Sequence, residues 1–208
     1  GFAEVSSQKN IGLTGNVDLR ASQGNAGLLL IDPTDLRITD TTSGGSQDGN
    51  ATDTTVGSGD ANQGSGSTLN TVSRGLLESL SGSANIVLQA TGQITVDAMA
   101  GGLIDLATTA GHGFTLQSTQ SGGIRFVDTN TEIRTQGGNI TLRVSGDVVA
   151  SSINASTGVL DVQSTEGRIV EALDLQGQGD AAADLAGATM KLEAQAIGAL
   201  GRGGQALE

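Results

Sequence analysis

The sequence lacks cysteine and is nearly free of aromatic residues, proline and histidine. Its 208 residues include no Cys, Trp or Tyr, three Phe, one Pro and one His. Without cysteine, the chain can form neither a disulfide framework nor a cysteine-ligated zinc site. Without Trp and Tyr, it lacks the usual stacking platforms of a carbohydrate-binding module. With so few aromatic side chains, its core has to be built from Ile, Val, Leu and Ala.

The sequence also has little positive charge and no long apolar run. It holds 22 acidic and 10 basic residues, for a formal net charge of −12. This balance opposes nucleic-acid binding, because no basic stripe is available to neutralise phosphates. The longest apolar run, residues 28–31, is far too short to span a bilayer. We therefore expect no nucleic-acid partner and no membrane insertion, and a chain of this length predicts a single domain.

What the sequence does have is glycine and a repeated short pattern. Glycine occurs 33 times. A small or turn residue is followed by alternating apolar and polar residues, as in Gly138, Asn139, Ile140, Thr141 and Leu142. The copies are residues 15–21, 84–90, 92–96, 102–107, 138–144, 158–163 and 188–194. Alternation with a period of two predicts β-strands with one apolar and one polar face.

The spacing of the copies predicts how these strands are arranged. Gly102 to Gly122 and Gly138 to Gly158 suggest a repeat of about 20 residues, with half-copies at 114–116 and 123–126. One repeat would then hold two or three short strands, which bury their apolar faces only by stacking on neighbouring repeats. We expect an all-β fold, a right-handed parallel β-helix that forms one unit over residues 1–208. Neither end supplies an evident polar cap, so we also expect a piece of a longer rod.

Two segments interrupt the repeat. Residues 39–67 are almost wholly polar and predict a long loop that projects from the solenoid. Residues 70–80 predict a short helix or turn that returns the chain to the solenoid. In this segment Val72, Leu76, Leu77 and Leu80 have helical spacing.

The polar loop is the candidate partner-binding region, because insertions on one side of a solenoid often form its binding surface. The alternative interpretation is that this segment is a solvent-exposed loop that binds no ligand. The candidate contact residues are Asp40, Asp48, Asn50, Asp53, Asp60 and Asn62. Their spacing does not match a calcium-binding EF-hand loop.

The polar positions of the repeats offer a second candidate surface. Asp105, Arg125, Thr141 and Asp161 lie at intervals near one repeat and would form a charged row if they were in register. Such a row is a candidate for binding calcium or an acidic sugar. The alternative is ordinary pairing of opposite charges on adjacent strands. Because the carboxylates are spread singly, we predict no catalytic, cofactor or metal site.

Two polar residue types at the corners have structural interpretations. His112 stands between glycines and has no partner His or Cys, so we expect an exposed turn residue rather than a metal ligand. Asn16, Asn85 and Asn139 occupy matching turn positions. We expect these asparagines to stabilise corners of the solenoid.

Three passages resemble the filamentous haemagglutinin-like adhesins, which are large exoproteins exported by two-partner secretion. Residues 28–38 contain a Leu-Leu-Leu-Ile-Asp-Pro strand, and residues 77–90 contain Leu80-Ser81-Gly82 followed by an Ala-Asn-Ile-Val-Leu-Gln-Ala strand. The third passage runs from residues 167–170 to Ala196-Ile197-Gly198. The resemblance spans most of the chain. It does not include the family's amino-terminal secretion module, so it implies a stalk segment.

The resemblance implies a secreted protein at the bacterial cell surface. The expected function is that of a structural or adhesive stalk in a large adhesin, without enzymatic activity. Its partners would be a glycan or protein receptor on a host cell, another bacterium or the matrix, and an outer-membrane transporter for the parent protein. The alternative is a carbohydrate-active β-helix enzyme similar to polysaccharide lyases or hydrolases.

Overall fold

In a computed structural model, the chain consists mainly of short β-strands. The structure describes residues 1–6, 19, 27–40, 69–172 and 183–198. Within these residues the strands form two seven-stranded sheets and one four-stranded sheet, and a single helix accompanies them. Every strand pair with an assigned register is parallel. The predictions of a mainly β fold and of parallel pairing are therefore confirmed.

The strands form three sheets, called sheets 1, 2 and 3, and neighbouring strands follow one another within each sheet in the order below. Sheet 1 contains β1 (Phe2–Ser6), β2 (Gly27–Asp32), β5 (Ala84–Ala90), β8 (Gly113–Ser118), β11 (Asn139–Val144), β14 (Val159–Ser164) and β17 (Thr189–Glu193). Sheet 2 contains β4 (Leu69–Ser73), β3 (Asp35–Thr39), β6 (Ile94–Val96), β9 (Ile124–Phe126), β12 (Val148–Ala150), β15 (Arg168–Glu171) and β18 (Ala196–Ile197). Sheet 3 contains β7 (Leu103–Leu106), β10 (Glu132–Thr135), β13 (Ser152–Asn154) and β16 (Leu185–Ala186).

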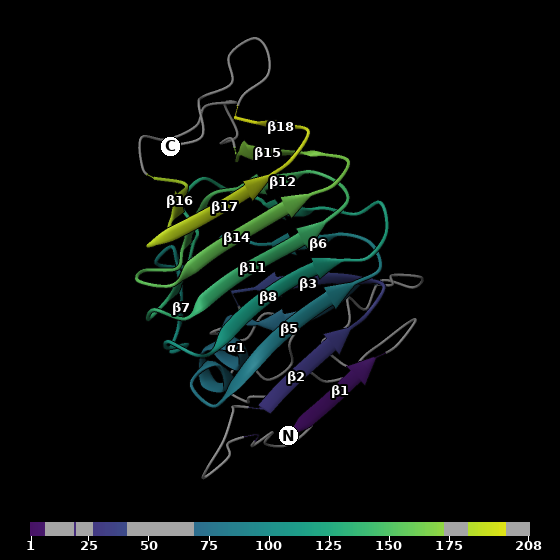
Figure 1. The fold of residues 1–208 in the computed structure, drawn as a ribbon. Helices are drawn as coiled ribbons and strands as arrows, with labels where there is room; N and C mark the ends of the chain where they lie inside the picture. The colour runs from purple at the N-terminus through teal and green to yellow at the C-terminus, as the bar shows by residue number, and fades with distance from the viewer. Residues whose placement is uncertain (7–18, 20–26, 41–68, 173–182, 199–208) are drawn as a thin grey trace.

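From β5 onward, the chain visits sheets 1, 2 and 3 in rotation. Each round adds one strand to each sheet, and we call one such round a layer. Figure 1 shows the strands of sheet 1 as parallel arrows that follow one another from β1 at the bottom to β17 near the top. This arrangement is compatible with a parallel β-helix.

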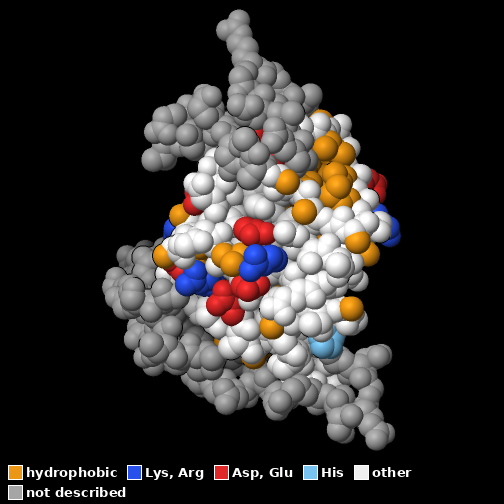
Figure 2. All heavy atoms as spheres, turned by 90° about the vertical axis from the view of Figure 1, so that its left-hand side faces the viewer, with side chains coloured by type: hydrophobic (Ala, Val, Ile, Leu, Met, Phe, Trp, Pro, Cys, Tyr) orange, Lys and Arg blue, Asp and Glu red, His pale blue; other side chains and the backbone are white. Residues whose placement is uncertain are grey.

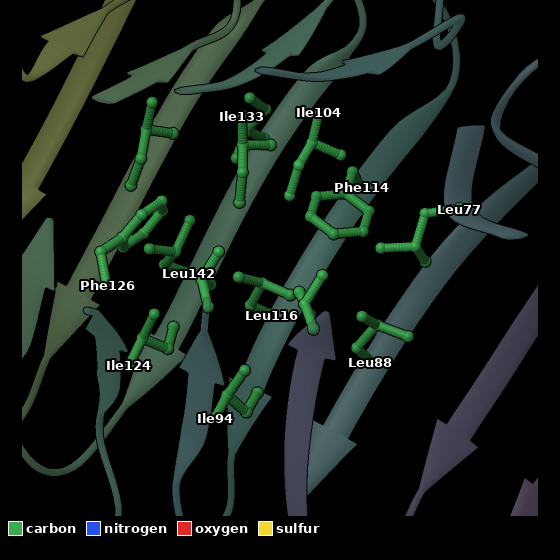
Figure 3. Packing of buried hydrophobic residues seen from close by; sticks show 14 of the residues in the cluster. Leu77, Leu88, Ile94, Ile104, Phe114, Leu116, Ile124, Phe126, Ile133 and Leu142 are labelled. Atoms are coloured by element: carbon green, nitrogen blue, oxygen red, sulfur yellow. The ribbon is translucent and has the colours of Figure 1, made fainter. Parts of the chain in front are cut away.

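The alternating pattern of the sequence places apolar residues on the inside of the sheets. In β5, Ala84, Ile86, Leu88 and Ala90 are buried and the residues between them are partly exposed. The register then stacks Ile86, Phe114, Ile140 and Leu160 from neighbouring layers. Figure 3 shows side chains from several strands and from the helix directed into this shared core. Each fully buried aliphatic side chain of this kind contributes about 1.5–3 kcal/mol.

The layers differ in length, which corrects the predicted repeat of about 20 residues. Ile140 pairs with Leu160, 20 residues further on, as Gly138 and Gly158 suggested. However, Ile86 pairs with Phe114, 28 residues further on. Gly102 precedes a strand of sheet 3 and Gly122 one of sheet 2, so these two glycines are not equivalent. The extra residues lie in the connections between strands, where length is least constrained by packing.

Glycines allow the corners between sheets 1 and 2 to stack closely. A Cβ atom on Gly122 would lie 2.0 Å from the carbonyl oxygen of Gly92 in the preceding layer. A Cβ atom on Gly167 would lie 2.4 Å from the carbonyl carbon of Gly146. No side chain fits at these distances, so glycine is required for the approach of the two backbones.

The segment predicted as a helix or turn over 70–80 contains the end of a strand and then a helix. β4 ends at Ser73, and α1 (Arg74–Ser81) follows, with the Ser73 hydroxyl accepting a hydrogen bond from the Leu76 N–H at 3.2 Å. Leu76, Leu77 and Leu80 face the core. Val72 belongs to β4 rather than to the helix, which corrects the predicted apolar face. No helix among the described residues has the length and apolarity that a membrane crossing needs.

The chain steps back by one position in sheet 2 between β3 and β4. Although β4 follows β3 in the sequence, it lies on the outer side of β3, away from β6. Of the predicted loop over 39–67, Thr39 ends β3 and Asp40 follows it. The remainder, 41–67, lies outside the described residues.

Candidate functional surfaces

The predicted charged row is not a single row in the structure. Asp105 lies on β7 of sheet 3, and Arg125 lies on β9 of sheet 2. Thr141 and Asp161 are opposite each other on β11 and β14 of sheet 1. Because the layers vary in length, equal spacing in the sequence does not give equal positions in the sheets. These four residues therefore do not form one charged row, and the alternative interpretation, pairing of opposite charges on adjacent strands, is the one that the described residues show.

Instead, charged residues on neighbouring strands pair with one another. Arg134 on β10 lies opposite Asp105 on β7, and its Nη2 is 3.2 Å from the Asp105 Oδ2. The pKa of Arg134 is raised mainly by the hydrogen bond from its Nε to Asp105. The attraction between the two charges is the second largest cause. On the next strand, the Asn154 amide donates to Glu132 Oε1 at 3.0 Å. These contacts join β7, β10 and β13 on their outer face.

Similar pairs link strands of the other two sheets. Arg143 Nη2 on β11 lies 2.5 Å from Asp161 Oδ2 on β14. Arg168 at the start of β15 donates to Asp147, which precedes β12, through Nη2 at 2.7 Å and through its backbone N–H at 2.9 Å. The side-chain hydrogen bond from Arg168 is the main reason that the pKa of the Asp147 carboxyl is lowered, and that of Arg168 is raised by the same bond. These are exposed or half-exposed pairs, so each adds only modest stability.

A polar cluster with several hydrogen bonds lies where α1 meets β7. Glu78 Oε1 accepts a hydrogen bond from the Asp105 N–H at 3.0 Å, and the Ser81 hydroxyl accepts one from the Ala107 N–H at 2.8 Å. Arg74 Nη1 donates to the Leu103 carbonyl at 3.3 Å. Figure 2 shows acidic and basic side chains gathered on the side of the molecule that carries α1 and β7 in Figure 1. Side chains of α1 therefore bond to backbone groups of the first strand of sheet 3.

Asp40 is the one candidate loop residue whose position is described. Its Oδ1 lies 3.2 Å from Arg74 Nη2, with the two side chains only 14% and 16% exposed, and its Oδ2 accepts a hydrogen bond from the Ala100 N–H. Arg74 also donates to the Ala100 carbonyl at 2.9 Å. Asp40 and Arg74 thus hold the turn before β7 from both sides. Asp48, Asn50, Asp53, Asp60 and Asn62 lie outside the described residues.

An open hollow lies along β14 and β17, near the upper end of the stack in Figure 1. Its volume is about 610 Å³, and it is lined by Arg143, Asp161, Gln163, Met190, Lys191, Leu192 and Glu193. It contains charges of both signs, and Asp161 in it is already bound to Arg143. Among the described residues, no three His, Cys, Asp or Glu side chains are placed to share a metal ion.

The corner residues behave largely as predicted. Asn85 Oδ1 accepts a hydrogen bond from the Gly113 N–H at 2.7 Å, and Asn139 Oδ1 accepts one from the Val159 N–H at 2.9 Å, so each asparagine links its layer to the next. Asn16 lies outside the described residues. His112 is in a turn, where its backbone N–H donates to the Thr109 carbonyl. The residue is partly buried rather than exposed.

The site residues predicted from the sequence did not include Arg74, Glu78, Arg134 or Arg143. Arg74 and Glu78 stand four residues apart in a segment predicted as helix, which is a recognised signal for side chains on one face. Comparisons of the chain with protein-family models, with curated proteins and with solved structures found no match.

Proposed function

We propose that this chain is a right-handed parallel β-helical segment of the rigid stalk of a large secreted bacterial surface adhesin. The main support for the proposal is the continuous register of sheet 1. Its seven strands pair in parallel, each with the next strand along the stack. Parallel strands joined by crossovers are right-handed in nearly all known cases, which favours the right-handed form. A stack of this kind suits a spacer that holds a contact region away from the cell.

The polar contacts support a structural role for the described surfaces. Arg134 and Arg143 each pair with a carboxylate on a neighbouring strand, and Arg168 pairs with Asp147 just before a neighbouring strand. Groups that neutralise one another between layers strengthen the stack and are less available to an external ligand. The region we propose for contact with a partner is therefore the polar segment at 39–67, which departs from the repeat.

Export and location are proposed from the sequence. Residues 28–38, 77–90 and 167–198 resemble passages of the haemagglutinin-like exoproteins, and a cysteine-free chain suits a protein that is threaded outward through a membrane. We infer that an outer-membrane transporter exports the parent protein. The partner would be a glycan or protein receptor on a host cell, another bacterium or the matrix.

The test of the adhesive role is a binding screen on glycan arrays and cultured cells. The chain is compared with a variant in which residues 42–66 are replaced by a short Gly-Ser turn. A second variant, Arg125→Glu, is the control, because Arg125 is exposed on the side of the stack and pairs with no carboxylate among the described residues. We expect the chain and Arg125→Glu to bind and the 42–66 replacement not to bind. Failure of the unaltered chain to bind any surface would contradict an adhesive role for this segment.

A second candidate function is a carbohydrate-active enzyme, which the hollow along β14 and β17 favours. Two carboxylates and two cations line it, Asp161 and Glu193 with Arg143 and Lys191. Paired carboxylates can supply general acid and base groups for glycoside cleavage. The test is the appearance of new reducing ends or unsaturated products from neutral and acidic polysaccharides, with Asp161→Asn as the control. Activity that disappears in this variant would favour the enzyme over the stalk.

A further inference from the structure

An apolar patch lies on the outer face of sheet 1, where most positions are polar. Leu28 and Leu30 alternate with the buried Leu29 and Ile31 on β2, so their side chains face outward. Val87 on β5 lies beside Leu30 in the register and faces the same way. All three outward side chains are partly exposed. We call Leu28, Leu30 and Val87 the outer apolar patch.

The column of outward residues that begins in this patch becomes polar further along the sheet. Leu30 and Val87 are followed by Thr115 and Thr141, which are also partly exposed. Threonine therefore suits this column, and the fold itself does not require aliphatic residues at its start. The patch does not depend on an end of the stack, because β2 has a described strand on each side. Contiguous apolar side chains on a surface are typical of a contact site.

The charged residues that border the outer apolar patch are acidic. Glu4 on β1 lies beside Leu30, and Asp32 follows Leu30 on the same face of β2. Asp32 accepts a hydrogen bond from the neutral amide of Gln89 at 2.8 Å. Neither carboxylate has a cationic partner among the described residues, unlike the carboxylates that arginine neutralises between other strands. This border favours a partner with positive charge and opposes an anionic lipid surface.

The strands that carry the patch are already paired, which limits the form of the partner. β2 is bonded to β1 on one side and to β5 on the other. Figure 1 shows sheet 1 in front of the other two sheets, so its outer face is turned to the viewer, with β2 and β5 in its lower half. An added strand needs a free edge, whereas a helix satisfies its own backbone and offers an apolar stripe. A helix is therefore the simplest element that can cover this face.

We infer that the outer apolar patch binds a basic amphipathic helix of a partner protein. The aliphatic stripe of the helix packs on the patch, and its lysine or arginine side chains lie beside Glu4 and Asp32. Apolar contact supplies most of the affinity, and the charges select and orient the partner. The inference does not rest on the adhesive function proposed above, because it concerns the outer face of sheet 1 and not the polar insertion.

The experiment measures binding of a labelled synthetic peptide to the full 208-residue chain by fluorescence anisotropy. The peptide has about 18 residues of leucine and lysine, arranged so that leucine forms one stripe of a helix. We expect a Kd of about 10–100 μM, as for a small contact. One control peptide has the same residues in strict alternation and so has no helical stripe. Another has glutamate in place of lysine. Both should bind about tenfold more weakly or less.

Variants of the chain locate the contact without relying on net charge. The double variant Leu30→Thr with Val87→Thr gives the patch the residue type that follows in the same column, and it should weaken binding about tenfold. Val159→Thr is its control, because Val159 is outward and partly exposed on β14, away from the patch. Asp32→Asn should weaken binding about threefold. Glu166→Gln removes one negative charge from an exposed turn and should have no effect.

The outcomes separate this inference from its alternatives. Absence of binding by the leucine–lysine helix at about 1 mM overturns it. Equal binding by the unaltered chain and the double threonine variant also overturns it, because binding would then depend on net charge. A dimer of the chain alone in sedimentation velocity that the double variant abolishes would show that a second copy occupies the patch instead. Circular dichroism of each variant checks that a loss of binding is not a loss of folding. Cell binding is measured separately, so failure of either proposal leaves the other standing.

Discussion

Among the described residues, the first strand of sheet 3 and the last strand of sheet 1 are both edges of parallel sheets, but only the first is capped by another described element. At β7, α1 occupies the position that a preceding strand would take. Glu78 and Arg74 bond to its exposed N–H and carbonyl groups, and Ser81 bonds to the N–H of the residue that follows it. At β17, no described element covers the edge, and Met190 is half exposed. Burial of an inward residue thus depends on its neighbours as much as on its type.

Helix geometry explains how α1 can replace a strand. Arg74, Glu78 and Ser81 lie along one side of the helix, about 6 Å and then 4.5 Å apart along its axis. Alternate residues of a strand are separated by about 6.6 Å, which is close enough for these side chains to reach groups at 103, 105 and 107 in order. The helix satisfies backbone groups that would otherwise offer a pairing site to another chain.

The largest expected effect on stability concerns the stacked inward residues of sheet 1, a column that runs from Ile86 through Phe114 to Met190 on β17. Within this column, the centre of the stack should differ most from the end at β17. Phe114→Ala should lower the free energy of unfolding by about 3–5 kcal/mol, since Phe114 is fully buried and its loss leaves a cavity. Met190→Ala in the same column should cost less than about 1 kcal/mol, because half of its side chain is already exposed.

Urea unfolding followed by circular dichroism measures both changes. Equal losses of stability in the two variants would show that the end of the stack is covered as well as the centre, and the comparison would fail.

The helix cap gives the next largest effect. Ser81→Ala removes the acceptor for the Ala107 N–H, so an unpaired backbone group should cost about 1–3 kcal/mol. Ser79→Ala on the same helix is the matched control, because Ser79 is exposed and its one side-chain hydrogen bond to a described residue is to the Leu76 carbonyl within the helix. Its effect should be within about 0.5 kcal/mol. Amide hydrogen exchange at Ala107 tests the hydrogen bond to Ser81 directly. The exchange should be faster in Ser81→Ala and unaltered in Ser79→Ala.

The sequence predicted the longer strands because their period is visible. Residues 84–90 and 138–144 alternate over enough positions to identify β5 and β11. The three-residue strand β13 contains only one inward residue, Ile153, so it shows no period and was not predicted. Strand β1 was missed as well, because no pattern in the sequence predicts that residues 2–6 pair with β2.

Contacts between layers were the least predictable feature. The pairing of Arg134 with Asp105 depends on how many residues each layer contains, and that number varies. The contacts of Glu78 and Ser81 depend on which strand lies beside α1. Asn85 and Asn139 were predictable, because an asparagine at a corner has a local role that needs no knowledge of register.

Strengthening the cap should sharpen the contrast between the two edges. Gly75 lies inside α1, and a Cβ atom there would meet no atom within 4 Å. Gly75→Ala should therefore stabilise the protein by about 0.5–1 kcal/mol through the better helix propensity of alanine. The comparison variant is Gly122→Ala, where the added Cβ would overlap the Gly92 carbonyl and should destabilise it. Thermal unfolding measures both, and a fall in stability on Gly75→Ala would mean that α1 tolerates no added side chain on that face.

The smallest effect concerns pH and the exposed pair of Asp147 and Arg168, which joins β12 and β15 toward the end at β17. The pKa of Asp147 is lowered in the folded protein by its hydrogen bond from Arg168, relative to an ordinary value of 3.8. The pair therefore contributes its full stability above about pH 4 and loses it as the pH falls through the lower pKa of the folded state. Solvent screens the pair, because the two side chains are 37% and 45% exposed, so the change should be smaller than that caused by Ser81→Ala. The free energy of unfolding of Asp147→Asn, followed from pH 6 to pH 2, should lie slightly below that of the unaltered chain at pH 6 and approach it at low pH. A constant difference over this range would assign the contribution of Asp147 to its position in the turn rather than to its charge.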